Sequence, residues 1–253
     1  MLFTHTLYIG IDLTARRPIY AALDADRRLT ALSCTGIEEV LAFLAGQPRA
    51  FVALNAPPRL NQGLMKQEQV RTQRSLPPLP VENADLRLAD YLLRQAGFRV
   101  PSVPGRLEDA PLWMQRGFAF YARLEKMGWQ PYPGGEAACQ WLETNAQAVF
   151  AILLGSGLLP PRTLEGRLQR QLILFEQGVT LTDPMEFFEE ITRRKLLHGL
   201  LPVEMVYTTG QLEALAAAYL AWLAASHAEQ VTGWGDRHEG MVFLPVSQKE
   251  KAE

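Results

Sequence analysis

The chain has 253 residues, 48% of them hydrophobic, which is enough to bury a full core in one large domain. Its net charge of −2 excludes a strong overall attraction to nucleic acid or to an anionic membrane, so any such binding must be local. Two distant cysteines, Cys34 and Cys139, indicate no disulfide framework, and the apolar stretch 214–225 is too short to cross a bilayer. We therefore expect a cytoplasmic protein that has no membrane association.

The first part of the chain predicts three strands, a helix and a further strand. Residues 6–11 are apolar or β-branched apart from one glycine, which is typical of a strand buried on both faces. Residues 18–23 and 28–34 follow after short turns and predict an antiparallel meander. A helix beginning at Ile37, with acidic residues in its first turn, then leads to a buried parallel strand at 50–54.

The rest of the chain is mostly helical. Residues 57–135 are interpreted as a helical insertion over one end of the sheet, within which the proline-rich residues 76–80 form neither a helix nor a central strand. A strand at 137–142 is followed by a helix that Thr144 and Gln147 would open as a capping box. Three more helices and a C-terminal hairpin complete the single domain 1–253, at about 164–176, 183–198, 210–226 and 231–244.

Four polar side chains are expected at one edge of the predicted sheet. Asp12 follows the first strand, Asn55 follows the fourth, Glu143 follows the fifth, and Glu213 lies near the start of the last helix. Glu213 is the only charged residue between 211 and 226, in a helix that is otherwise apolar and therefore buried. Because ligands bind at the carboxyl ends of parallel strands, we expect these four side chains to form a metal site.

Oxygen ligands favour Mg²⁺ or Mn²⁺, and a pair of such ions commonly activates water against a phosphodiester. The pattern therefore predicts Asp12, Glu143 and Glu213 as catalytic residues and all four as metal ligands. Each residue also has a simpler structural interpretation. Asp12 would cap a turn, Glu143 would precede a helix cap, and Glu213 would complement the dipole of its helix.

Basic residues and one hydroxyl predict contacts with substrate phosphates. Arg167 and Arg170 are three positions apart and share one helix face, and Thr14 directly follows the first strand. We expect these three side chains to bind substrate, although arginines on a helix more often cover a solvated face. The segment 234–240 contains several potential metal ligands, but its spacing favours a hairpin turn over a metal site.

The order of elements is that of the ribonuclease H-like fold. The sequence also resembles the predicted RNase H-like nucleases grouped as domain of unknown function 429, over most of its length. The resemblance depends on an ordered series of segments: Gly10-Ile11-Asp12, Ala53-Leu54-Asn55-Ala56-Pro57, Leu142-Glu143-Thr144-Asn145, 166–170, 212–218 and 235–245.

This resemblance implies an α/β, ribonuclease H-like fold with a mixed five-stranded central sheet flanked by helices, a helical insertion and a C-terminal hairpin. The implied acids map onto Asp12, Asn55, Glu143 and Glu213. Asn55 replaces the second acid, and Glu213 replaces the usual aspartate of the last helix. The expected function is a divalent-metal-dependent nuclease or phosphodiesterase that acts on nucleic acid with Mg²⁺ or Mn²⁺.

Two other functions stay open. The amide at Asn55 favours a catalytically degenerate domain that binds nucleic acid or a protein partner. Residues 9–14 also resemble the first phosphate loop of actin-like and sugar-kinase phosphotransferases. That architecture needs a duplicated domain and a second glycine-rich loop, and the sequence contains neither.

Overall fold

The computed structural model describes residues 6–74 and 85–246 and shows an α/β protein built on one mixed sheet. The strand order is β3-β2-β1-β4-β6-β8-β7, and the short β5 pairs with β6. The central strands run parallel, whereas the first three strands and the last hairpin are antiparallel. The strands are β1 (Leu7–Asp12), β2 (Ile19–Leu23), β3 (Leu29–Cys34), β4 (Ala50–Leu54), β5 (Gln130–Pro131), β6 (Cys139–Thr144), β7 (Val231–Asp236) and β8 (Gly240–Pro245).

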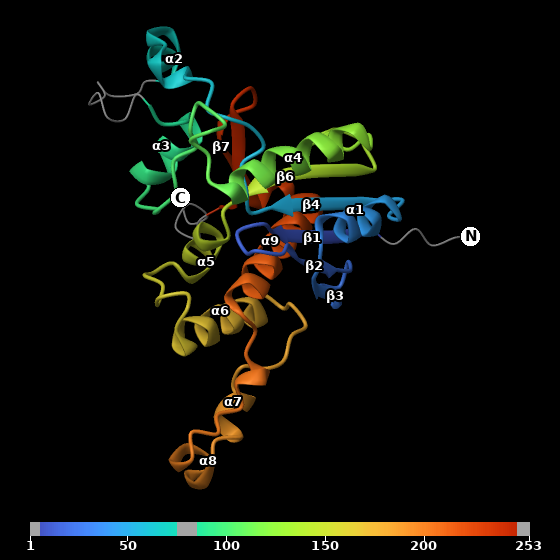
Figure 1. Ribbon diagram of the computed structural model, residues 1–253, viewed down its shortest axis with the longest axis vertical. Helices are drawn as coiled ribbons and strands as arrows, with labels where there is room; N and C mark the ends of the chain where they lie inside the picture. Colours follow the sequence, from blue (N-terminus) through green and yellow to red (C-terminus); the bar gives the residue numbers. More distant parts are fainter. Residues whose placement is uncertain (1–5, 75–84, 247–253) are drawn as a thin grey trace.

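Helices cover both faces of this sheet (Figure 1). On one face α9 lies along β1 with α5 and α6 beside it, and on the other face lie α1 and α4. The described helices are α1 (Ile37–Ala45), η1 (Leu64–Lys66), α2 (Glu68–Gln73), α3 (Leu88–Gln95), α4 (Leu112–Lys126), α5 (Ala146–Leu154), α6 (Leu164–Glu176), α7 (Glu186–Glu189), α8 (Arg193–Leu197), η3 (Val203–Met205), α9 (Thr209–Ser226) and η4 (Ala228–Gln230).

The alternation of side chains along β1 separates two cores. Ile9 and Ile11 pack with α1 and α4, while Tyr8 packs on the side of α9. Gly10 faces α9 directly, because a Cβ atom there would lie 1.9 Å from the backbone oxygen of Ala214. The helix backbone therefore rests on the strand, and this close contact fixes where the first turns of α9 meet the end of β1.

Most predicted elements are confirmed, but the predicted count of five strands is wrong. Within the described residues the sheet has eight strands, because the C-terminal hairpin is part of it rather than an appendage. Its strand β8 pairs in parallel with β6, through Glu143 opposite Val242 and Thr144 opposite Phe243. The short β5 adds a further strand beside β6.

Two helix boundaries also differ from prediction. Asn145, not Thr144, caps α5, and its side chain accepts a hydrogen bond from the backbone N–H of Ala148. The helix predicted over 183–198 is two short helices, because α7 ends at Glu189 and Thr192 begins a new helix as the N-cap of α8. The prediction for residues 76–80 lies outside the described residues.

Within residues 6–74 and 85–246, no helix combines the length and the apolar character that a membrane span requires. Cys34 and Cys139 are both free thiols.

Candidate functional site

Asp12 and Glu213, here called the acid pair, meet where the end of β1 lies under the first turns of α9. Asp12 is fully buried and Glu213 is partly exposed. The side-chain nitrogen of Asn55 lies 3.3 Å from Asp12 Oδ1 and 3.2 Å from Glu213 Oε2. The two carboxylates are therefore on either side of one amide group, as the sequence predicted for these three residues.

Thr14 holds the Asp12 carboxylate from the loop after β1. Its backbone N–H donates to Asp12 Oδ1 at 3.1 Å, and its hydroxyl lies 2.8 Å from Oδ1 and 3.0 Å from Oδ2. Thr14 itself is exposed. The structure thus places Thr14 at the site, with its hydroxyl directed towards Asp12.

Asn55 is oriented by a third hydrogen bond. Its Oδ1 accepts the backbone N–H of Ala146, the first residue of α5, at 3.1 Å. With the oxygen directed at this N–H, the NH₂ group must face the acid pair. The reverse orientation would place two donors against each other, so the Ala146 N–H determines which end of the amide the carboxylates meet.

The acid pair has perturbed proton affinities. Burial first, and then the negative charge of Asp12, raise the pKa of Glu213 to about 7, against a weaker opposing effect of a hydrogen bond from Gln147. Burial also raises the pKa of Asp12, although hydrogen bonds from Thr14 and Asn55 oppose this effect. Glu213 therefore exchanges a proton near neutral pH.

Gln147 connects Glu213 to a buried arginine. Its Nε2 donates to Glu213 Oε1 at 2.7 Å, and its Oε1 accepts from Arg170 Nη2 at 2.7 Å. Arg170 is only 1% exposed, and its Nη1 donates to the backbone oxygens of Leu159 and Gly166. Arg170 therefore supports the acid pair from behind, through Gln147, and is not displayed to substrate.

Arg167 lies one turn before Arg170 on α6. Within the described residues it makes no hydrogen bond to the acid pair, so its predicted contact with substrate stays a prediction.

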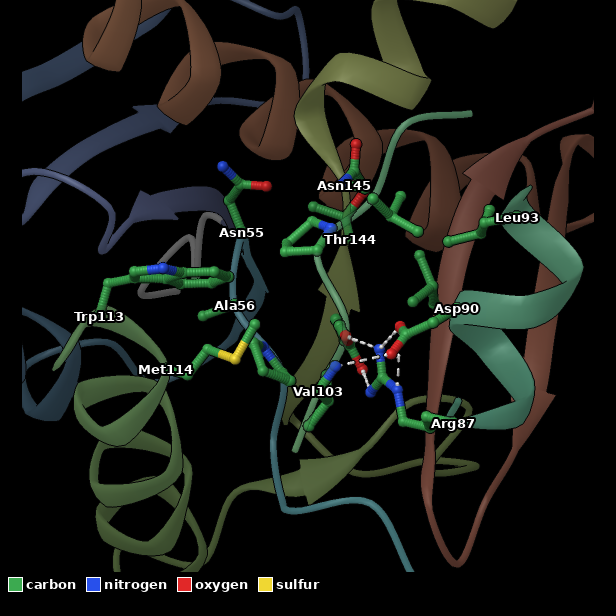
Figure 2. Close-up of a pocket in the computed structure, with 15 residues that line it drawn as sticks. Asn55, Ala56, Arg87, Asp90, Leu93, Val103, Trp113, Met114, Thr144 and Asn145 are labelled. Carbon is green, nitrogen blue, oxygen red and sulfur yellow. Dashed lines mark hydrogen bonds and ion pairs between the residues drawn. The ribbon is translucent and has the colours of Figure 1, made fainter. Parts of the chain in front are cut away.

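Glu143 lies elsewhere. It is buried and makes a two-pronged ion pair with Arg87, with distances of 2.8 Å and 2.7 Å, and Arg87 also pairs with Asp90 at 2.9 Å. Figure 2 shows the Arg87 and Asp90 side chains across the pocket from Asn55. The structure therefore brings Asp12, Asn55 and Glu213 together and leaves Glu143 in a separate buried cluster.

The alternation of side chains explains this separation. Ala53 and Leu142 are opposite each other in the β4–β6 register and both face α9, so Asn55, two residues beyond Ala53, faces α9 as well. Glu143 is opposite Leu54 and faces away from α9, on the side of Trp141. Glu143 reaches the expected edge of the sheet, but on the wrong face for a shared site.

The predicted Mg²⁺ or Mn²⁺ does not fit this arrangement as it stands. An ion shared by Asp12 and Glu213 would lie between their oxygens, where Asn55 presents a hydrogen-bond donor. Among the residues that the structure describes, no group of three or more His, Cys, Asp or Glu side chains is placed to hold an ion. Metal binding at the acid pair would require the Asn55 side chain to turn away, at the cost of its bond to Ala146.

The sequence contained a signal for Gln147 that was interpreted as a helix cap. Gln147 is the only polar side chain in α5, whose other residues are apolar. The same reasoning that singled out Glu213 in α9 applies to it. Arg87 had no comparable signal, because its partner Glu143 is 56 positions away and only the fold brings the two together.

Comparisons of the chain with protein-family models, with curated proteins and with solved structures found no match.

Proposed function

We propose that this protein is a hydrolase of phosphate esters, with nucleic acid as the expected substrate class and the acid pair as its catalytic centre. One observation carries the proposal. Two carboxylates share a partly open site, and one of them has a pKa of about 7. A general acid or base works best when its pKa lies near the working pH, and perturbed pKa values cluster at functional sites.

Positive charge near the acid pair supports an anionic substrate. Arg16 and Arg17 follow Thr14 directly and are exposed on the loop after β1. Arg162 is exposed as well, and its charge is close enough to lower the pKa of Glu213. Arginine pairs well with phosphate oxygens, so these side chains would hold a phosphate group over the acid pair.

A groove beside the site is large enough for an extended substrate. It has a volume of about 780 Å³ and shares Gln147 and Arg170 with the supporting network of Glu213. Its walls include the aromatic ring of Phe98 and the exposed side chain of Arg99. Single-stranded nucleic acids are commonly bound by grooves that combine cationic and aromatic side chains.

In the proposed mechanism, ionised Glu213 takes a proton from a water molecule that attacks the phosphorus atom. The oxygen–phosphorus bond to the leaving group then breaks, and the leaving oxygen takes a proton from solvent. Asp12 is too deeply buried to contact substrate, and its charge instead raises the proton affinity of Glu213. Gln147 holds the Glu213 carboxylate in one orientation.

The strand order supports assignment to the ribonuclease H-like fold. In that fold, an antiparallel meander of three strands is followed by parallel strands that are added on the side of the first strand, as in β3-β2-β1-β4-β6 here. We also propose the cytoplasm as the location, because nucleic acid substrates are present there and the two thiols would stay reduced. Mg²⁺ or Mn²⁺ stays a prediction, and no step above depends on it.

The test is hydrolysis of a generic phosphodiester, bis-p-nitrophenyl phosphate, and of single-stranded DNA and RNA, with and without Mn²⁺. Glu213→Gln should lower the rate at least about 100-fold, as expected for loss of a general base. Glu165→Gln, an exposed glutamate on α6, is the matched control and should keep full activity. The rate should rise with pH up to about 7 and then level off. Absence of any hydrolysis with all three substrates would overturn the proposal.

Two observations favour a second function, binding without catalysis. Asn55 stands where the resemblance expects an acid. Both carboxylate oxygens of Glu143 are paired with Arg87. A domain that lost its chemistry would keep the arginines around Thr14 and the groove. Binding of single-stranded nucleic acid that is equal in the wild-type protein and in Glu213→Gln, with no hydrolysis in either, would select this alternative.

A further inference from the structure

A protruding arm, residues 184–205, carries six of the ten large apolar side chains that are exposed in the described residues. The arm comprises α7, α8 and η3, and Figure 1 shows it extending beyond α6, away from the sheet. Its most exposed apolar side chain, Leu197, is 76% exposed. Large exposed apolar side chains occur at six positions of the arm: Met185, Phe188, Leu196, Leu197, Leu200 and Val203. Apolar surface gathered in this way marks an interaction site more often than isolated exposed residues do.

The arm has a defined structure because its other side is anchored. Phe187 is 2% exposed and packs in a small core with Leu168 of α6 and with Val206. Ile191 and Leu201 pack against the same core. One side of the arm is thus fixed to the body, and the opposite side has no cover within the described residues.

An apolar pocket lies at the base of the arm, between α6 and α7. It has a volume of about 440 Å³, and its lining includes Leu168 and Leu172 of α6 and Met185 and Phe188 of the arm. A leucine side chain is small enough to enter it. The arm therefore offers both protruding leucines, at Leu197 and Leu200, and a cavity that suits them.

The arm carries charges of both signs on separate helices, so the arms of two copies can be complementary to each other. Acidic residues gather on α7 and basic residues on α8, and one internal ion pair joins Lys195 to Glu190 at 2.7 Å. Glu186 and Glu189 on α7, and Arg193 and Arg194 on α8, are exposed and form no ion pair within the described residues. Two such arms, antiparallel about a two-fold axis, would place the acids of each against the bases of the other.

We propose that the arm is a dimer interface between two copies of this chain. Leu197 and Leu200 of each copy enter the pocket between α6 and α7 of the other, and α7 pairs with the partner's α8. An anionic membrane surface is a poorer occupant, because it would attract the bases of α8 but repel the acids of α7, whereas a second copy of the arm pairs with both. A two-fold interface repeats every contact, so each complementary pair counts twice.

Sedimentation equilibrium of the full chain tests the proposal, because it measures mass without assuming shape. The wild-type protein should be dimeric at about 100 µM, where a dimer with a micromolar Kd is almost fully formed. The double variants E186K/E189K and R193E/R194E should each be monomeric, since the four charges at positions 186, 189, 193 and 194, which form no ion pair within the described residues, then all have one sign. Mixed in equal amounts, they should form a heterodimer, because both contacts become complementary again.

A second pair of variants separates packing from charge. Leu197→Ser should weaken the dimer at least tenfold, whereas Leu112→Ser, which changes an exposed leucine outside the arm, should not. Both positions are exposed, so neither change should prevent folding. A wild-type monomer at about 100 µM, or equal weakening by the two serine variants, would overturn the proposal. So would a monomer that binds vesicles of anionic lipid through the arm.

Discussion

Asn55 meets Glu213 as a hydrogen-bond donor, with its side-chain nitrogen 3.2 Å from Glu213 Oε2. An amide in this position reduces the repulsion between two carboxylates without adding charge. It does so incompletely, because the negative charge of Asp12 still raises the proton affinity of Glu213. The protonation of Glu213 therefore depends on the Asn55 amide and on the charge of Asp12 together.

The stability of the protein should fall as pH rises from about 4.5 to about 7. The pKa of Glu213 is raised from 4.5 to about 7 on folding, so in this window the folded chain binds more protons than the unfolded chain. The full effect is on the order of 3 kcal/mol of unfolding free energy. The raised pKa of Asp12 acts in the same direction at lower pH. Urea unfolding at half-unit pH steps would measure the fall.

Glu213→Gln should flatten this pH dependence between about 5 and 7.5, because the group that binds the extra proton is gone. Glu165→Gln should keep it, since Glu165 is an exposed residue on α6. An unchanged pH profile in Glu213→Gln would show that another group is responsible, and that Glu213 is not the proton carrier of the acid pair.

Gln147→Leu should raise the pKa of Glu213 above its value in the wild-type protein. The lost hydrogen bond favours the ionised carboxylate, and its removal also leaves Arg170 Nη2 without an acceptor. Arg170 is buried, so the loss of its acceptor should lower the unfolding free energy by about 1–3 kcal/mol. Carboxyl ¹³C chemical shifts would report the pKa. Gln95→Leu, on the exposed surface of α3, should change neither quantity.

The sequence predicted the strands and the helix of the site better than it predicted on which face of the sheet each side chain lies. The strand that ends at Asp12, the strand that Asn55 follows and the helix that carries Glu213 were all predictable, because apolar runs and a single acid in an apolar helix are local signals. Glu143 was predicted at the same edge, and it does lie there, as the last residue but one of β6. Its face depends on the register of β6 against β4, and a register is a long-range property that no local pattern states.

The support behind the site was harder to predict. Gln147 reaches across to Glu213, and Arg170 reaches Gln147 from another helix, so both contacts require the packing of α5, α6 and α9. The pairing of the C-terminal hairpin with the sheet was not predicted for the same reason, because it too is a long-range contact. A hairpin is local, but its pairing with β6 joins residues about 100 positions apart, such as Glu143 and Val242.

Gly10→Ala should strongly destabilise the protein. The new Cβ would lie 1.9 Å from the Ala214 oxygen and 2.2 Å from the Ala218 nitrogen, both backbone atoms of α9, which no side-chain rotation can relieve. Displacing a buried helix costs more than the 1–3 kcal/mol of ordinary overpacking. Thermal unfolding would measure it. Gly157→Ala is the control, because a Cβ there meets nothing within 4 Å, and it should be nearly neutral.

Asn55→Asp should lower the stability of the metal-free protein. The new carboxylate would still accept the Ala146 N–H through one oxygen. Its other oxygen would replace the amide nitrogen that lies 3.3 Å from Asp12 and 3.2 Å from Glu213, so two favourable hydrogen bonds become two repulsive contacts. The pKa of at least one carboxylate should rise further, and the loss of stability should increase with pH.

The same substitution should create affinity for a divalent ion, because three carboxylates then face one point that no donor fills. Calorimetric titration with Mn²⁺ should show binding to Asn55→Asp at least tenfold tighter than to the wild-type protein, and the bound ion should restore the lost stability. Asn145→Asp is the matched control. It adds the same charge nearby, but its side chain caps α5 and bonds Ala148, so Mn²⁺ affinity and stability should change little. If the wild-type protein binds Mn²⁺ as tightly as Asn55→Asp does, then Asn55 already turns aside to admit the ion, and the donor orientation described here is not the working state of the site.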